Sequence, residues 1–263
     1  GDGVTHSLIG RRVIIDGWLR DWNDPLNREK AGYFGSECDG GYAQYTKVSH
    51  QQVHPVDTTM SDAELATFAC SYVTAENMLN RAAVTDEDTV LITGASGGVG
   101  SALIQLANRR GAKCVALCGA GKADAVKAVG PLAVIDRASA NLGSALHDAI
   151  GKDSVDVVAD VVGGALWPQL ISALARGGRY TCAGAIAGPM VEFDLRTFYL
   201  RDLTFTGATV PPPGVFQDLI GYIERDEIQP LLAATYPLEE LHTAQQAFID
   251  KRHVGNIVVE PFV

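Results

Sequence analysis

The chain has neither a long apolar run nor a dense basic segment, and each absence excludes a class of protein. No apolar run approaches the roughly twenty residues that cross a bilayer, and the residues from Gly1 to His6 lack the charged-then-apolar pattern of a secretory signal. The 21 Lys and Arg are outnumbered by 31 Asp and Glu, and no local basic cluster offsets the net charge of -10. This charge is unfavourable for a phosphate backbone. We therefore expect a cytoplasmic protein with no nucleic-acid partner and no membrane partner.

Cysteine is scarce and is not spaced for metal or redox chemistry. The five cysteines, an odd number, include no C-x-x-C pair. The spacing therefore suggests neither a zinc ribbon nor a thioredoxin-like site, and we expect reduced thiols that pack in the fold. At 263 residues, of which 47% are hydrophobic, the chain is long and apolar enough to bury a core.

The segment from Val90 to Gly100 joins a buried-strand pattern to a glycine-rich turn and a helix. Gly94, Gly97 and Gly100 have the G-x-x-G-x-x-G spacing, which permits a tight turn and a close approach of backbone to a pyrophosphate. Apolar residues at helical spacing follow, so a helix N-terminus directs free N–H groups at the anion. The segment predicts the pyrophosphate site of a dinucleotide.

Short apolar runs alternate with helical patterns through the middle of the chain. Near-continuous apolar strands are typical of a parallel sheet covered by helices on both faces. The fold class predicted is α/β, with a doubly wound Rossmann sheet that binds its ligand at the carboxyl ends of the strands. The six predicted strands cover residues 90–93, 113–117, 133–135, 155–161, 179–182 and 203–206.

The two ends of the chain have a different texture. The first part is mainly β, with a polar, turn-rich lobe between two predicted strands, and the last part returns after three consecutive prolines. Because proline stiffens the chain, residues 211–213 are a candidate crossing between domains. The predicted elements are strands at 12–15, 41–48 and 256–259 and helices at 215–223 and 241–248. The expected domains are residues 1–65, 66–209 and 210–263.

Two features distinguish between families that share such a turn. The motif also satisfies the short-chain dehydrogenase pattern T-G-x-x-x-G-x-G, but those enzymes begin with the turn, and here 93 residues precede Gly94. They also need a Tyr with a Lys four residues later, because the lysine lowers the tyrosine pKa for proton transfer. None of the eight tyrosines has a lysine at that spacing.

The order of motifs resembles the medium-chain dehydrogenase/reductase superfamily, above all its zinc-independent, quinone-oxidoreductase-like and alcohol dehydrogenase-like branch. The segments that carry the resemblance are Gly35 to Tyr45, Cys70 to Leu79, Gly94 to Gly100, Asp156 to Gly164 and His253 to Val259. The resemblance implies a Rossmann domain beside a GroES-like catalytic domain that is mainly β. Family members carry a longer front end, so we expect this chain to begin inside the GroES-like domain and to have only part of it.

The resemblance also bears on metal binding. Zinc-dependent relatives place a catalytic ligand at the position of Cys70, but the two ligands they carry upstream are not in this sequence, and catalytic zinc wants three protein ligands. The lobe that holds structural zinc in those relatives has only Cys38 here. We therefore expect no metal. A zinc-dependent alcohol dehydrogenase whose ligands lie upstream of this chain stays an alternative.

The end of the second Rossmann strand bears on the cofactor. NAD-specific folds place an acid there against the ribose 2′-hydroxyl, whereas this chain reads Cys-Gly-Ala-Gly-Lys from Cys118 to Lys122. No carboxylate in that stretch would repel a 2′-phosphate, and Lys122 adds a positive charge, so NADP(H) is favoured. The alternative is an ordinary surface lysine and a site that accepts both cofactors. The glycine turn, the end of the second strand and the family resemblance together give the predicted cofactor residues. These are Thr74, Gly94, Ser96, Gly97, Gly98, Val99, Gly100, Gly119, Lys122, Val162, Gly184 and Ile186.

The chemistry expected is hydride transfer to or from a small-molecule carbonyl, quinone or activated alkene without metal, because the hydride belongs to the cofactor. The catalytic residue is unknown, and Tyr72 is the one candidate proton donor. Relatives often carry a lysine near the cofactor phosphates, and this chain has Asn256 at that position. A nucleotide-binding module inactive through truncation is a further alternative. Family analogy also predicts a homodimer through the last Rossmann strands, near Leu203 to Thr209.

Overall fold

The computed structural model describes residues 8–261, and the chain divides into two compact units. One unit contains the chain up to Val73 together with the part from Val210 onward, and the other contains Thr74 to Thr209. The chain leaves the second unit directly before the three prolines. The expected start inside a front domain, near Gly1, lies outside the described residues.

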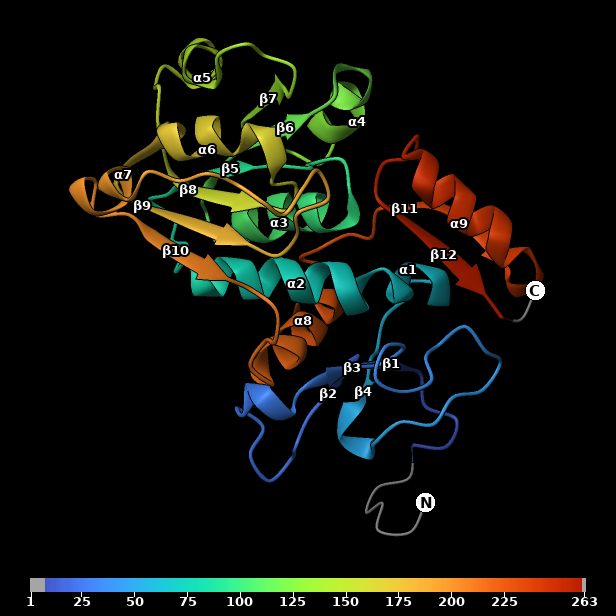
Figure 1. The fold of residues 1–263 in the computed structure, drawn as a ribbon. Coiled ribbons are helices and arrows are strands. Elements are labelled where there is room, and N and C mark those ends of the chain that lie inside the picture. The colour runs from blue at the N-terminus through green and yellow to red at the C-terminus, as the bar shows by residue number, and fades with distance from the viewer. Residues whose placement is uncertain (1–7, 262–263) are drawn as a thin grey trace. The chain divides into compact units, whose positions relative to one another are not determined.

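The unit from Thr74 to Thr209 contains a six-stranded sheet whose order is β10-β9-β8-β5-β6-β7 (Figure 1). Every neighbouring pair is parallel. The order therefore reverses at β5 and β8, as in a doubly wound Rossmann sheet, and the predicted α/β fold class is confirmed. The strands are β5 (Thr89–Ile92), β6 (Lys113–Cys118), β7 (Ala133–Asp136), β8 (Val155–Asp160), β9 (Leu174–Cys182) and β10 (Thr204–Gly207).

Helices follow the strands of this sheet in turn. The apolar face of α5 packs with α6 and with strand residues such as Leu91 and Leu117, which forms one fully buried core. The helix after β5 packs against β5 and β6. Among residues 8–261 no helix has the length and apolar character needed to span a membrane. These helices are α3 (Gly98–Arg109), α4 (Ala123–Lys127), α5 (Leu142–Ile150), α6 (Trp167–Ala173) and α7 (Leu195–Leu200), with the 3-10 turns η3 (Ala120–Lys122) and η4 (Gly164–Leu166). Helix α2 (Phe68–Arg81) precedes β5 and contains the boundary between the two units.

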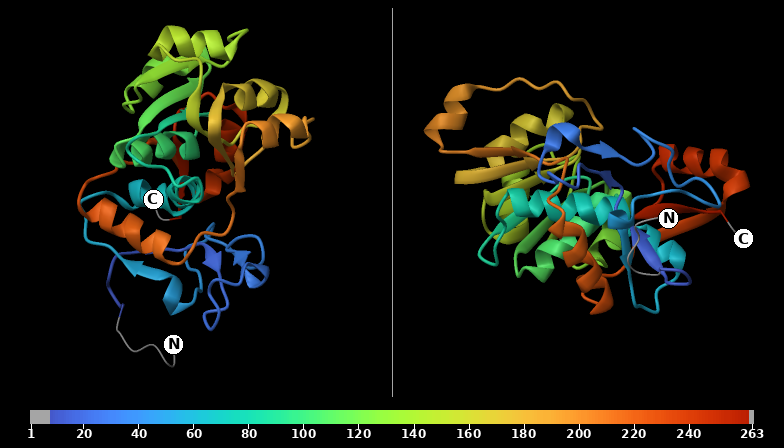
Figure 2. Two further views of the ribbon diagram at one scale, coloured as in Figure 1. Left: turned by 90° about the vertical axis from the view of Figure 1, so that its left-hand side faces the viewer. Right: turned by 90° about the horizontal axis from the view of Figure 1, so that it is seen from below.

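The other unit is built from small sheets. Strand β1 (Val13–Ile15) pairs antiparallel with β4 (Val53–Pro55), and β2 (Trp18–Leu19) pairs antiparallel with β3 (Gly32–Tyr33). A third, parallel pair has α9 packed along it (Figure 2). The remaining elements are α1 (Asp62–Ala66), α8 (Gly214–Glu224), α9 (Leu241–Asp250), β11 (Leu232–Pro237), β12 (Asn256–Glu260), η1 (Arg28–Lys30), η2 (His50–Gln52) and η5 (Leu238–Glu240).

The strand predicted over residues 41–48 is wrong. These residues form bends and irregular chain, and two of their aromatic side chains are largely exposed, Tyr42 at 66% and Tyr45 at 85%. The hydroxyl of Thr46 donates to the Gly40 carbonyl at 3.1 Å, a local bond that folds the segment back on itself. A run with strand composition becomes a strand only beside a partner, and this segment pairs with none in the described part of the chain.

Candidate functional site

The glycine-rich turn joins β5 to α3 and has a shape that side chains would not permit. Gly94 has φ +58°, in the left-handed region, and a Cβ atom there would lie 3.0 Å from the Val161 side chain. A Cβ on Gly100 would lie 2.7 Å from the Cα of Ala95. The first turn of α3 therefore packs directly against the end of β5. Gly97 is the N-cap of α3 and makes no side-chain cap hydrogen bond, so backbone N–H groups are what the helix start presents.

The turn lies where the order of strands reverses. β5 pairs with β6 on one side and with β8 on the other, so the loops after β5 and β8 are neighbours. The loop after β8 is in turn bonded to the loop after β9, because the Ala187 N–H donates to the Val162 carbonyl at 2.9 Å and the Gly164 N–H donates to the Gly188 carbonyl at 3.0 Å. Open α/β sheets bind ligands in such a crevice. Three loops therefore meet at the expected place for a dinucleotide.

A buried carboxylate lies under these loops. Asp160, the last residue of β8, is fully buried, and its oxygens accept hydrogen bonds from the hydroxyls of Thr93 at 2.5 Å and Tyr180 at 2.6 Å. Burial, and next the bond to Asp160, raise the pKa of Tyr180, so its hydroxyl keeps the proton it donates. In the sequence Asp160 was only one residue of the segment from Asp156 to Gly164 that carries the family resemblance, and none of these partners could be read there.

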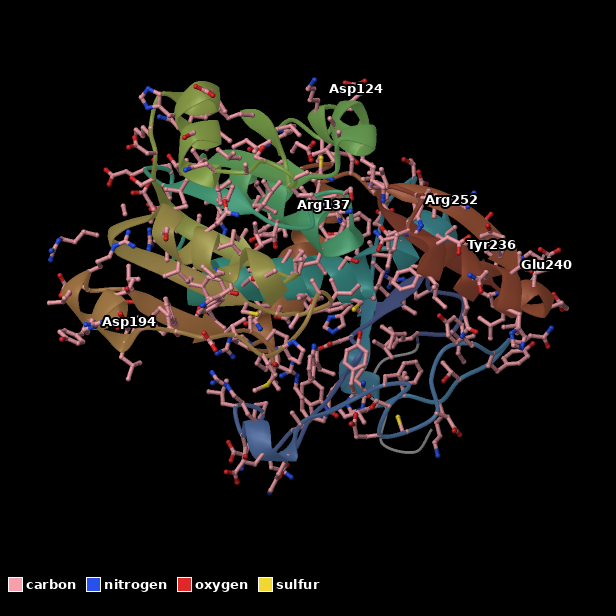
Figure 3. All side chains as sticks on the ribbon, turned by 45° about the horizontal axis from the view of Figure 1, so that its top comes forward. Asp124, Arg137, Asp194, Tyr236, Glu240 and Arg252 are labelled. Atoms are coloured by element: carbon pink, nitrogen blue, oxygen red, sulfur yellow. The ribbon has the colours of Figure 1, made fainter. Side chains whose placement is uncertain are left out.

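Two cations meet at the neighbouring strand ends. Lys122 lies in η3, which closely follows β6, and Arg137, labelled in Figure 3, directly follows β7. A Cβ atom on Gly119 would lie 3.7 Å from the Nε of Arg137. Burial, and next the positive charge of Arg137, lower the pKa of Lys122. Arg137 was not singled out in the sequence. The signal that could have found it is its position one residue past the third strand, which neighbours the second in a doubly wound sheet.

Most predicted cofactor residues come together at these strand ends. The partly buried residues from Ser96 to Val99 span the end of the turn and the start of α3, and Gly119 and Lys122 lie after β6. A Cβ on Gly184 would lie 3.0 Å from the Val161 carbonyl, so the loops after β8 and β9 touch there. Ile186 is on the same loop but is 72% exposed. Thr74 lies apart from these loops in sequence, half-buried on α2.

The structure does not support Tyr72 as a proton donor. Its side chain is fully buried and packs against Phe68, with ring centroids 4.5 Å apart. Its hydroxyl donates to the carbonyl of Gln229 at 2.6 Å. A buried hydroxyl whose proton is already donated to a backbone carbonyl is not available to a reacting atom, and we therefore withdraw Tyr72 as a catalytic candidate.

Comparison with known proteins agrees with this geometry. The zinc-binding dehydrogenase family matches residues 98–225. An acryloyl-coenzyme A reductase of Metallosphaera sedula is 29% identical over 98% of this chain and 79% of its own length. An NAD-dependent alcohol dehydrogenase of Sulfurisphaera tokodaii is 26% identical over 99% of this chain and 78% of its own length.

A solved structure decides the family. A candidate alcohol dehydrogenase from Sinorhizobium meliloti 1021 superposes with a TM-score of 0.94 and 46% sequence identity, covering all of this chain and 72% of that one. The chain belongs to the medium-chain dehydrogenase/reductase superfamily. This confirms the expected resemblance and places the chain among oxidoreductases. As a superfamily member it has the quinone-oxidoreductase-like and alcohol dehydrogenase-like character that its motifs indicated.

The donor set in the described residues does not fit the zinc that the family description names. Among residues 8–261 no group of three or more His, Cys, Asp or Glu side chains could hold a metal ion. Cys70, which the family resemblance placed at the position of a zinc ligand, instead lies beside the hydroxyl of Tyr33. Catalytic zinc needs three protein ligands, and the described residues do not supply such a set.

Proposed function

We propose that this superfamily member is an NADP(H)-dependent oxidoreductase that transfers hydride to or from a carbonyl, quinone or activated alkene without metal. The observation that carries the proposal is the pair of cations, Lys122 and Arg137, beside Gly119 at the ends of β6 and β7. In a doubly wound sheet the adenosine ribose lies at the end of the second strand, which is β6 here. The two cations would therefore face its 2′-phosphate.

Electrostatics favours a phosphate at this position over a hydroxyl. Burial is the larger cause of the lowered pKa of Lys122, and the positive charge of Arg137 is the second; a dianion near both cations would offset both effects. NADH carries only a hydroxyl at the 2′ position and offers no such relief. The name of the Sulfurisphaera tokodaii relative specifies NAD, so a site that accepts both cofactors is the competing proposal.

The residues of the chain would bind and orient. The backbone N–H groups at the start of α3 would hold the pyrophosphate, and the loop from Val161 to Gly163 would lie along the nicotinamide half. Bound NADPH would supply the hydride from C4 of its nicotinamide ring. Proximity and the exclusion of water are the contributions that these residues can make. With Tyr72 withdrawn, solvent or another polar side chain would supply the proton.

The names of the relatives favour two candidate reactions. The Metallosphaera sedula relative is named for reduction of acryloyl-coenzyme A, whose alkene is activated by a carbonyl, and this favours an electron-poor small molecule. The second candidate is alcohol oxidation with zinc supplied by ligands upstream of this chain, which the names of the family and of the alcohol dehydrogenase relatives favour. One zinc ion held per chain by a longer product would decide for the second candidate.

We further propose a homodimer, and we retain a cytoplasmic location as a prediction. β10 is an edge strand of the six-stranded sheet, and the segment before it exposes apolar side chains, including Met190 at 88%, Leu195 at 67% and Tyr199 at 61%. An exposed edge beside apolar surface is a surface that a second copy can cover.

The test of the cofactor proposal is a fluorescence titration of the chain with NADPH and NADH side by side. We expect NADPH to bind at least tenfold more tightly, since two charge-assisted contacts to the 2′-phosphate are absent from NADH. Equal affinities would favour a site that accepts both. Absence of binding to either cofactor would overturn the proposed function.

A further inference from the structure

The carboxylate of Asp160 accepts hydrogen bonds from four donors, which is a full set for a buried carboxylate. Besides the hydroxyls of Thr93 and Tyr180, it accepts the N–H of Val162 at 2.8 Å and the N–H of Gly163, whose nitrogen lies 3.2 Å from one oxygen and 3.1 Å from the other. These donors come from the end of β5, the loop after β8 and strand β9. One side chain therefore links three segments that converge on the crevice.

The network places the loop after β8 against the glycine turn. The hydroxyl of Thr93 donates to Asp160 and accepts the N–H of Val161 at 3.0 Å, so it is bonded on both sides. Thr93 directly precedes Gly94, where a Cβ would lie 3.0 Å from the Val161 side chain and 3.2 Å from that of Val162. The loop and the turn are thus held in contact by the buried side chains of Thr93 and Asp160.

Burying a charged side chain at this point of the sheet costs free energy. Removing a carboxylate from water costs several kcal/mol, and only a full set of donors compensates. The neighbouring strand positions are apolar and fully buried, as Val157, Val158 and Ala159 are, so an apolar residue would pack the sheet. A carboxylate does what such a residue cannot, because it turns two successive backbone N–H groups of the loop inward.

We infer that Asp160 is a positioning residue for the nicotinamide half of the cofactor. This inference rests on the proposed function, and it concerns only the second half of the sheet, β8 to β10. The first half, β5 to β7, carries Lys122 and Arg137 and would bind the adenosine half, because each half of a doubly wound sheet binds one mononucleotide. Because Asp160 is fully buried, it would act through the backbone of Val162 and Gly163.

The experiment compares three ligands on the wild type and on Asp160→Asn. NADPH and NADH contain the nicotinamide half, whereas 2′,5′-ADP contains only the adenosine half with its 2′-phosphate. The amide of asparagine replaces one charged acceptor oxygen by a donor, so the Gly163 N–H loses one of its two acceptors and the bonds from both loop N–H groups lose their charge assistance. We expect the affinities for NADPH and NADH to fall by the same factor, about tenfold, with 2′,5′-ADP changed less than about twofold.

Two outcomes would overturn the inference while leaving the proposed function intact. One is unchanged NADPH binding by Asp160→Asn. The other is an equal loss for 2′,5′-ADP, which would mean that the substitution damages the unit as a whole. A wild type that binds neither NADPH nor NADH would instead overturn the proposed function, and this inference with it.

A second set of variants keeps the test decisive if Asp160→Asn does not fold. Thr93→Val removes the hydroxyl that bridges Asp160 and Val161, whereas Thr93→Ser keeps it, so serine should retain the NADPH affinity that valine loses. Tyr180→Phe is the matched control, because it removes one donor of Asp160 but neither loop N–H. We expect a lower melting temperature and NADPH affinity within about threefold. Equal losses in Thr93→Ser and Thr93→Val, or in Tyr180→Phe, would contradict the positioning role.

Discussion

A Cβ atom on Gly100 would overlap the carbonyl oxygen of Gly94, and this closeness determines the shape of the turn between β5 and α3. Because the first turn of the helix lies directly on the end of the strand, its backbone N–H groups are presented at the strand end without side chains in front of them. The glycine spacing read in the sequence is thus explained by packing as well as by the expected ligand.

Gly100→Ala should therefore weaken both the fold and the cofactor site. The added methyl group would overlap backbone atoms of Gly94 and Ala95, which cannot move aside as a flexible side chain could. Overpacking of this kind costs about 1–3 kcal/mol of stability. Chemical denaturation and an NADPH titration would measure the two effects. Gly214→Ala is the matched control, because no atom lies within 4 Å of the new Cβ and the residue begins α8. Wild-type behaviour of Gly100→Ala would mean that the turn can open without cost.

Lys122→Ala and Arg137→Ala should each reduce the preference for NADPH over NADH. A charge-assisted contact to phosphate is worth about 1.5–3 kcal/mol, which corresponds to at least tenfold in affinity. NADH affinity should stay within about twofold, because the 2′-hydroxyl makes no such contact. Lys127→Ala, a lysine of α4 paired with Asp124 on the surface, is the control and should change neither affinity. A parallel loss for both cofactors would show that the cations do not read the 2′-phosphate.

The preference for NADPH should depend on pH at both ends of the range. It should increase as pH rises through about 6, where the 2′-phosphate loses its second proton. It should decline in alkaline solution, because Lys122 is charged only below its pKa, and burial and Arg137 lower that pKa. Arg137→Ala should move the alkaline decline to higher pH by removing the repulsion. Titrations of both cofactors across this range would test it, and a flat NADPH-to-NADH ratio would contradict the role of Lys122.

Arg179→Met should lower stability without changing cofactor affinity. The guanidinium donates to the carbonyls of Ala82 and Ala83 at 2.9 and 2.8 Å and pairs with Asp88, all near the amino end of β5 and away from the crevice. Since Asp88 is nearly buried, we expect a loss of about 2–3 kcal/mol in denaturant unfolding. Arg176→Met breaks an exposed ion pair and should cost less than about 0.5 kcal/mol. Equal effects of the two substitutions would contradict this reasoning.

Tyr199→Glu should shift the molecular mass measured by light scattering from dimer to monomer. Tyr199 belongs to the exposed apolar segment that precedes edge strand β10, and a charge buried between two copies is costly. Leu132→Glu places the same charge on an exposed apolar residue beside β7, the opposite edge strand, and should leave the mass unchanged. A wild-type monomer at all concentrations would contradict the proposed homodimer.

Local patterns predicted the Rossmann unit well because its elements are strongly periodic and its turn is specified by glycine. Strand β9 nonetheless begins at Leu174, five residues before the predicted start, since Arg176 and two glycines interrupt its apolar pattern. The predicted strand at 41–48 failed for the opposite reason: its composition favours a strand, but no partner strand lies beside it in the described chain.

The sequence by itself determined the α/β sheet, the glycine turn and the lack of a carboxylate between Cys118 and Lys122, because each is a property of neighbouring residues. Only the tertiary structure placed Arg137 beside Gly119 and buried the side chain of Tyr72. It also brought Thr93, Val162 and Tyr180 together around Asp160. These contacts join residues from different strands, and their distances depend on the order of strands in the sheet. Spacing along the chain carries no such information.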